Sequence, residues 1–243
     1  SVAPDRILVD HLAFSARVAL DSAGIAYGDV VLGHPSALPL PASGDRPGQT
    51  YGYPPEWPAA FTPDATALSE LRALCERVSE RFTAEWNAAL TALNPSAEPV
   101  PVAFEEHGAT LLYNYPAELA PEREGAFLGS AVRTEPLDAE VEAWLAANDE
   151  PYVYVSFGSF LSVRGDVLGR VAAALQQLGL RAALALGSAD PAEVGELPAD
   201  WLVRGFLPQV RLLDGAVAAV THGGNNSVTE AVTAGVPMLV LPF

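Results

Sequence analysis

The residues best suited to chemistry lie in the segment 221–237, which directly follows the apolar run 218–220. Gly223 and Gly224 let the backbone turn sharply there and approach a ligand closely. A helix is expected to begin near Asn226, where free backbone N–H groups and the positive end of the helix dipole favour an anion. The segment therefore predicts a phosphate-binding turn between a strand and a helix.

Two ionisable side chains flank this turn. His222 ends the strand and can supply a hydrogen bond or a positive charge, and Glu230 lies one turn along the helix, where its carboxylate can accept from two ribose hydroxyls. A structural alternative stays open, because Ser227 and Glu230 also match a capping box, in which both side chains bind backbone donors and no ligand. A purely structural His222 is the second alternative.

Two other segments end in residues of similar potential. The run 153–159 passes from an apolar strand into a loop of small residues and then a helix, which makes it a second phosphate-binding candidate or an ordinary turn. In the run 201–209, Phe206 lies close to Gln209, so a planar base could stack on the ring and bind the amide.

After position 150, apolar strands alternate regularly with helices, and these elements are expected to position the residues described above. Strands that are apolar throughout and alternate with helices indicate a parallel sheet covered on both faces, with ligands bound beyond the carboxyl ends of the strands. The expected strands are 152–156, 181–186, 202–206, 218–221 and 238–241, and the expected helices are 166–178 and 226–234.

The first part of the chain is less regular. A Pro-rich segment with several aromatic residues, 33–63, is expected to be a long surface loop, and the amphipathic pattern of 64–93 predicts one long helix. An acidic, partly helical segment then separates a domain at 1–135 from a second at 150–243. The remaining elements expected in the first domain are strands at 6–9, 29–32, 110–113 and 127–132 and a helix at 13–23.

Composition excludes several classes of protein. Thirteen Arg and no Lys face 30 carboxylates in 243 residues, for a net charge of −17, which argues against binding a nucleic-acid polymer. No apolar run is long enough to span a membrane, and the single cysteine, Cys75, excludes an intrachain disulfide and a cysteine-based zinc cluster. We therefore expect a soluble, cytoplasmic protein, with an oligomeric state that the composition leaves open.

In order and spacing, these segments resemble the donor-binding half of the nucleotide-sugar-dependent glycosyltransferases of the two-Rossmann-domain (GT-B) type. That family includes UDP-glucosyl and glucuronosyl transferases and bacterial macrolide and antibiotic glycosyltransferases. The resemblance implies an α/β fold of two Rossmann-like domains, each incomplete here, with acceptor binding in 1–135 and donor binding in 150–243. The matching segments are 156–159, 205–209, 222–227, Glu230 and 235–238.

The resemblance also implies roles for individual residues. The substrate would be a UDP- or dTDP-sugar, with no cofactor and no metal required. Because the protein is so acidic, positive potential at the diphosphate must be local, from the helix dipole, His222, and Arg204 or Arg164. The implied donor-binding residues are His222, Ser227, Gly224, Asn226 and Ser159 at the diphosphate, Glu230 at the ribose, and Gln209 and Phe206 at the base, where the family usually has Trp in place of Phe206.

The implied reaction is an inverting transfer, which requires a general base for the attacking hydroxyl. Asp10 resembles the aspartate that orients the family's catalytic histidine, and is a possible partner of a base not present in this chain. His11 follows Asp10 directly, so in a strand the two side chains point to opposite faces and cannot pair. His34 lies in the Pro-rich loop, facing either the acceptor or solvent. We therefore assign no residue of this sequence as the general base.

The leading hypothesis is a transferase that acts on a hydroxyl of a small lipophilic acceptor, such as a natural product. The absent base favours the alternative of a non-catalytic nucleotide-sugar binding module, an auxiliary subunit or an inactive fragment. A nucleotide-sugar epimerase is a further alternative on the same architecture. Since the family continues beyond the position of Phe243 with an acidic residue and a Gln that bind the sugar, we expect this polypeptide to be a piece of a longer protein.

Overall fold

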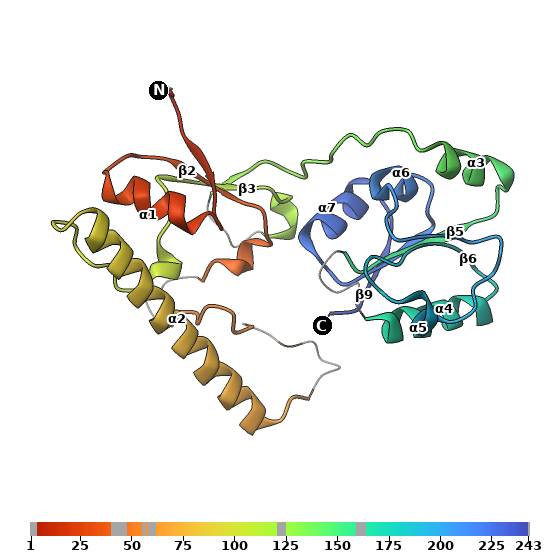
Figure 1. The fold of residues 1–243 in the computed structure, drawn as a ribbon, viewed down its shortest axis with the longest axis horizontal. Helices are drawn as coiled ribbons and strands as arrows, with labels where there is room; N and C mark the ends of the chain where they lie inside the picture. The colour runs from red at the N-terminus through yellow and green to blue at the C-terminus, as the bar shows by residue number, and fades with distance from the viewer. Residues whose placement is uncertain are drawn as a thin grey trace. The chain divides into compact units, whose positions relative to one another are not determined.

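The computed structural model describes residues 4–39, 48–54, 57, 62–120, 125–158 and 164–242. The chain forms two compact units, Ser1–Gly129 and Ser130–Phe243 (Figure 1). This division lies before the boundary expected near 135–150, because helix α3 (Ala139–Ala147) packs into the second unit. Val141 of α3 is fully buried there among residues of the second sheet.

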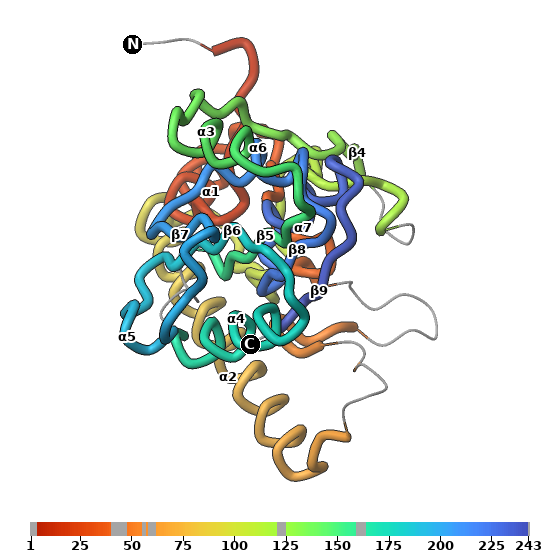
Figure 2. The backbone as a smooth tube through the Cα atoms, turned by 90° about the vertical axis from the view of Figure 1, so that its right-hand side faces the viewer, coloured from red at the N-terminus to blue at the C-terminus, as the bar shows by residue number. Residues whose placement is uncertain are grey.

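The second unit contains a five-stranded parallel sheet in the order β7-β6-β5-β8-β9, the order in which the strand labels follow one another in Figure 2. The predicted parallel sheet is thus confirmed. The chain runs outward from β5 through β6 to β7 and then returns to place β8 on the other side of β5. The strands are β5 (Tyr152–Ser156), β6 (Arg181–Ala185), β7 (Leu202–Arg204), β8 (Ala218–Thr221) and β9 (Met238–Val240).

Helices cover both faces of this sheet (Figure 1). Every residue of β5 is buried, and alternate residues enter two different cores: Val153 and Val155 pack with α4, whereas Tyr152 and Tyr154 pack with α3, α6 and α7. This two-sided burial explains why the strand is apolar throughout. The helices are α4 (Gly165–Gln177), α5 (Pro191–Val194), α6 (Gln209–Leu213) and α7 (Asn225–Thr233).

The short helices α5 and α6 are absent from the sequence prediction. The beginning and end of α5 are nevertheless marked by sequence signals, because Asp190 accepts a hydrogen bond from the Ala192 N–H at 2.9 Å, Pro191 is the first helical residue, and Gly195 follows with φ +88°. Helix α6 follows Pro208 and is only five residues long, too short to show a helical period.

The first unit has a four-stranded parallel sheet in the order β1-β2-β3-β4. Its two helices pack together through Val18 of α1 and Trp86 and Leu90 of α2, beside Phe82. The elements are β1 (Leu8–Asp10), α1 (Phe14–Ser22), β2 (Gly28–Val31), α2 (Ala65–Leu93), β3 (Thr110–Tyr113) and β4 (Ala126–Phe127), with 3₁₀ turns at Pro35–Ala37, Ala103–Glu105 and Ala117–Leu119.

The strand predicted over 127–132 is wrong beyond Phe127. The Leu128 N–H donates to the Tyr113 carbonyl at 2.8 Å, and Gly129 then adopts φ +73°, a left-handed conformation outside the extended range of a regular strand. Leu128 is also 57% exposed, so its apolar side chain does not enter the core. The apolar run was therefore misleading, because only its first residue pairs with β3.

Candidate functional site

The candidate site lies at the carboxyl ends of β5 and β8. Ser156 and Thr221 are register partners at the ends of these adjacent parallel strands. From β5 the chain goes to β6 on one side, and it later returns as β8 on the other, so the loops that follow β5 and β8 diverge at a topological switch point. Open α/β sheets bind their ligands at such points.

His222 lies between two glycine turns at this point. A Cβ added to Gly158 would lie 2.7 Å from His222 Cε1, and one added to Gly224 would collide with the same ring. Gly158 also has φ +67°. The hydroxyls of Ser156 and Thr221 stabilise the turns, since each accepts from the N–H two residues later at 3.3 Å. Only glycines allow the backbone to come this close to the imidazole.

The environment of His222 affects the pKa of its imidazole. Desolvation by burial lowers its pKa below the ordinary value. Its Nδ1 is buried and has no hydrogen-bond partner within the part of the chain that the structure describes. Burial thus disfavours the charged form of the imidazole at this turn.

Ser227, Gln209 and Glu230 form a chain of hydrogen bonds. The Ser227 hydroxyl donates to Gln209 Oε1 at 3.3 Å, and Gln209 Nε2 donates to Glu230 Oε2 at 2.5 Å. Helix α7 begins at Asn225 with Gly224 as its N-cap and no side-chain cap, so the capping-box alternative is wrong. The structure thus brings together three residues that the resemblance assigns to different parts of one nucleotide.

Asn225 is a residue that the sequence argument passed over. Both polar atoms of its side chain are buried, and neither has a hydrogen-bond partner among the described residues. Leaving such groups unpaired costs about 1–3 kcal/mol each. The two atoms lie in the same β8–α7 turn as the unpaired His222 Nδ1, so the buried side-chain atoms left without a partner among the described residues of this unit gather at one place.

The other predicted donor-site residues differ in accessibility. Phe206 follows β7 and is 69% exposed, so its ring is free to stack, and Asn226 is exposed in the first turn of α7. The two arginines considered as local charges are already paired, because Arg204 binds Asp138 at 2.7 Å and Arg164 binds Asp166 at 2.7 Å. Ser159 lies outside the described residues.

In the first unit, Asp10 is exposed at the carboxyl end of β1. Its Oδ1 accepts from the Leu12 N–H at 2.9 Å, which fixes the turn after the strand. His11 does not pair with Asp10, as expected from their adjacent positions, and its Nδ1 lies 3.0 Å from Asp29 Oδ2. His34 Nδ1 lies 2.7 Å from the Ser36 hydroxyl.

Asp29 is the centre of a buried polar cluster that the sequence argument missed. It is fully buried on β2, and its Oδ2 lies 3.4 Å from Nε of Arg17, which is 1% exposed, and 3.3 Å from the Gly108 N–H. Burial alone would raise the pKa of Asp29, but the His11 hydrogen bond and the Arg17 charge together lower it. A lone carboxylate within the apolar run 28–31 was the signal that could have found it.

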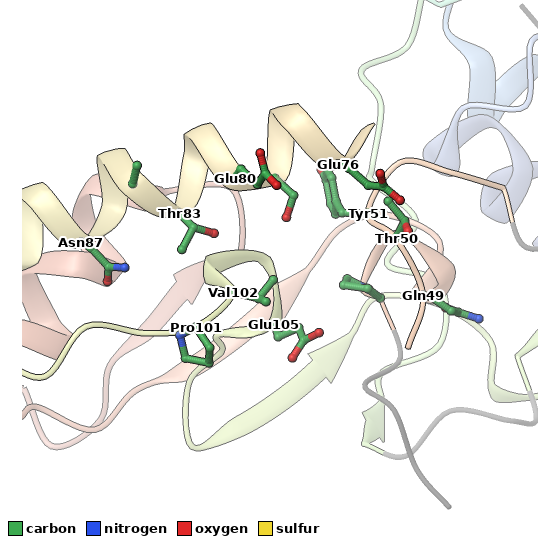
Figure 3. A pocket seen from close by; sticks show the side chains of 13 residues that line it. Gln49, Thr50, Tyr51, Glu76, Glu80, Thr83, Asn87, Pro101, Val102 and Glu105 are labelled. Carbon is green, nitrogen blue, oxygen red and sulfur yellow. The ribbon is translucent and has the colours of Figure 1, made fainter. Parts of the chain in front are cut away.

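A cavity of about 520 Å³ also lies in the first unit (Figure 3). Side chains of α2 line one side, and residues 101–105 line the other. Tyr51, whose ring stacks on Phe104 at 3.6 Å, supplies an aromatic wall. Three carboxylates also line the cavity, so it combines apolar surface with negative charge: Glu76, Glu80 and Glu105.

The residues that the structure describes contain no group of three or more His, Cys, Asp or Glu side chains arranged to hold a metal ion. None of the helices in this part of the chain has the length and hydropathy needed to cross a membrane.

Known proteins resemble this chain in sequence and in fold. The family described as "UDP-glucoronosyl and UDP-glucosyl transferase" matches residues 75–243. "NDP-glycosyltransferase YjiC" of Bacillus subtilis is 29% identical over 96 residues, which are 39% of this chain and 24% of that protein.

Solved structures resemble the chain over nearly its whole length. The glycosyltransferase SnogD from Streptomyces nogalater gives a TM-score of 0.63 at 20% identity, covering 99% of this chain and 55% of that one. "UDP-glucose: anthocyanidin 3-O-glucosyltransferase in complex with UDP" gives 0.58 at 17% identity, covering 98% of this chain and 57% of that one. The chain thus spans little more than half of these structures.

The fold of the two units is that of the GT-B glycosyltransferases. Because the family match covers more than half of the sequence, the chain belongs to the family of UDP-glucuronosyl and UDP-glucosyl transferases.

Proposed function

We propose that the second unit binds the nucleotide-sugar donor of an inverting glycosyltransferase, which transfers the sugar from a UDP- or dTDP-sugar to a hydroxyl of a small lipophilic acceptor. The observation that carries this proposal is the β8–α7 turn at the switch point. There, buried polar groups of His222 and Asn225 without described partners adjoin the uncapped N-terminus of α7. Such a turn suits an anionic diphosphate.

Neighbouring residues extend the proposed site along the nucleotide. In this proposal His222, Gly224, Asn226 and Ser227 bind the diphosphate, together with Ser159. Glu230 binds the ribose, and Phe206 and Gln209 bind the base. The supporting fact is the hydrogen-bonded chain from Ser227 through Gln209 to Glu230, which holds these groups at one end of α7.

The proposed chemistry needs two kinds of assistance. The departing nucleoside diphosphate gains negative charge, so donors that are already oriented at α7 stabilise the transition state more than the ground state. The attacking hydroxyl must lose a proton, and Asp10 is proposed to orient a histidine base from outside this chain. The scheme uses no metal ion and no cofactor, and it operates in the cytoplasm.

The acceptor is proposed to bind in the first unit. The cavity beside Tyr51 is large enough for a small molecule and offers an aromatic wall for an apolar body. Its carboxylates favour an acceptor that also carries a protonated amine. A panel of matched acceptors with and without a basic amine tests this preference, and equal use of both kinds would argue against it.

Titration of the chain with UDP and dTDP, followed by transfer assays with labelled UDP-glucose and dTDP-glucose over the acceptor panel, tests the proposed function. Binding together with transfer supports the transferase. Binding without transfer favours the alternative of a nucleotide-sugar binding module. The proposal is wrong if neither nucleotide binds.

Replacing Asn225 by Ala separates a ligand-binding role from a structural one. Because neither polar atom of Asn225 is paired, we expect the variant to be as stable as the wild type, or more stable, when no ligand is present. The rise in melting temperature caused by saturating UDP should shrink at the same time. Asn148→Ala, at the end of α3, is the contrasting control, because Asn148 Oδ1 accepts from the Glu150 N–H at 2.7 Å, so this variant should lose some stability and keep the full UDP-induced shift. Lower stability without UDP, or an unchanged UDP-induced shift, would contradict the prediction.

A further inference from the structure

The segment that leads into the second unit, residues 130–138 (the linker segment), is attached to the helices of the proposed nucleotide site. At its beginning, the Thr233 hydroxyl of α7 donates to the Ser130 hydroxyl at 2.9 Å. In its middle, the backbone N–H of Arg211 on α6 donates to Glu135 at 3.2 Å. At its end, Asp138 binds Arg204, so the segment is held along its length.

Residues of this segment line two cavities. One, of about 310 Å³, lies between the linker segment and Phe206 with Pro208. The other, of about 390 Å³, lies between the linker segment and the helices α6 and α7, and Glu230 lines it. Arg133 lines both cavities. It therefore lies between the residue proposed for the base and the residue proposed for the ribose.

Arg133 also balances the charge of this region. Its guanidinium lies 3.0 Å from Glu135 and 3.9 Å from Glu230, and the side chains of these carboxylates are only 9% and 5% exposed. Two poorly solvated carboxylates would repel an anionic nucleotide, and the repulsion would be strong because little water screens it. Arg133 is itself 51% exposed, so it can face a ligand while it contacts both carboxylates.

We propose that Arg133 is a nucleoside-binding residue of this site, which holds Glu230 for the ribose and closes the base cavity opposite Phe206. The inference rests on the proposed function and adds a residue outside the segments that carry the family resemblance. A planar guanidinium suits both tasks, because it can pair with carboxylates and stack on a flat ring.

Calorimetry on the whole chain with three probes tests this assignment: UDP, uridine and inorganic pyrophosphate. For Arg133→Ala we expect affinity for UDP and for uridine to fall about tenfold, the scale of a lost stacking and charge contact, with pyrophosphate binding unchanged. Arg133→Lys keeps the charge but not the planar group, so it should recover only part of the loss.

Arg170→Ala is the matched control, because Arg170 is an exposed arginine on α4 of the same unit. It should leave all three affinities unchanged. Unchanged affinity of Arg133→Ala for uridine and UDP would overturn the assignment, as would an equal loss for pyrophosphate, which would indicate a general electrostatic effect. If the wild type binds no UDP, the proposed function fails first; if it binds UDP and the variant binds it equally well, only the role of Arg133 fails.

Discussion

Replacing His222 by Ala is expected to weaken UDP binding by about 10- to 100-fold, because a hydrogen bond to a charged group contributes about 1.5–3 kcal/mol. Uridine lacks the diphosphate, so its affinity should stay unchanged. Calorimetric titration with both ligands measures the difference. Gly158→Ala should reproduce the effect without touching the imidazole chemically, because its added methyl group would displace the His222 ring.

The same imidazole predicts how UDP affinity depends on pH. Burial lowers the pKa of His222 in the free protein, and a bound diphosphate would raise it by placing negative charge beside the ring. Since the complex then binds more protons than the free protein, affinity should rise as the pH falls through the bound-state pKa. The pH dependence of UDP affinity that remains in His222→Ala comes from protonation of the UDP phosphate itself. If UDP affinity depended equally on pH in the wild type and the variant, the pKa of His222 would not change on binding.

His107→Ala is the control for both measurements, because His107 is an exposed histidine in the first unit. It should change neither the affinity nor its pH dependence. If His222→Ala binds UDP as tightly as the wild type does, the assignment of the β8–α7 turn to the diphosphate is wrong.

The sequence predicted the second unit well because its signals are local. The strands β5 and β6 are mostly apolar because each is buried on both faces, and that pattern is visible without knowing their neighbours. The glycines after β8 likewise mark a turn by their own conformational freedom. Phe206, Gln209 and His222 each follow a strand of this parallel sheet. They could therefore be placed at the same edge, because parallel strands end together.

What the sequence could not predict are contacts between distant residues. Ser227 and Glu230 fit a capping box locally, but Gln209, 18 and 21 positions away, binds both side chains instead. Arg133 contacts Glu230 across nearly a hundred residues, and no local pattern indicates that pairing. The partners of Asp29 could not be predicted for the same reason. A lone carboxylate in an apolar strand indicates a buried partner but does not identify it.

The Asp29 cluster leads to the largest expected loss of stability. Asp29→Ala leaves the Arg17 guanidinium buried without its carboxylate, although Arg17 also donates to the carbonyls of His11 and Glu106. Removing one partner of a buried ion pair costs about 3–5 kcal/mol. We therefore expect the midpoint of urea unfolding, followed by circular dichroism, to fall strongly. Glu85→Ala is the control, because it breaks an exposed ion pair with Arg81 that contributes at most about 1 kcal/mol.

The loss should arise from the unpaired charge and not from the lost side-chain volume, and a double variant distinguishes the two. Arg17→Met with Asp29→Leu removes both charges and keeps apolar bulk, so its stability should exceed that of Asp29→Ala and approach the wild type. Acid should mimic the single variant: because the folded-state pKa of Asp29 is lowered, its stabilising effect is present above the ordinary carboxyl pKa and is lost as the pH falls below it. If the double variant were as unstable as Asp29→Ala, packing and hydrogen bonds to the backbone, not charge pairing, would hold β1, β2 and α1 together.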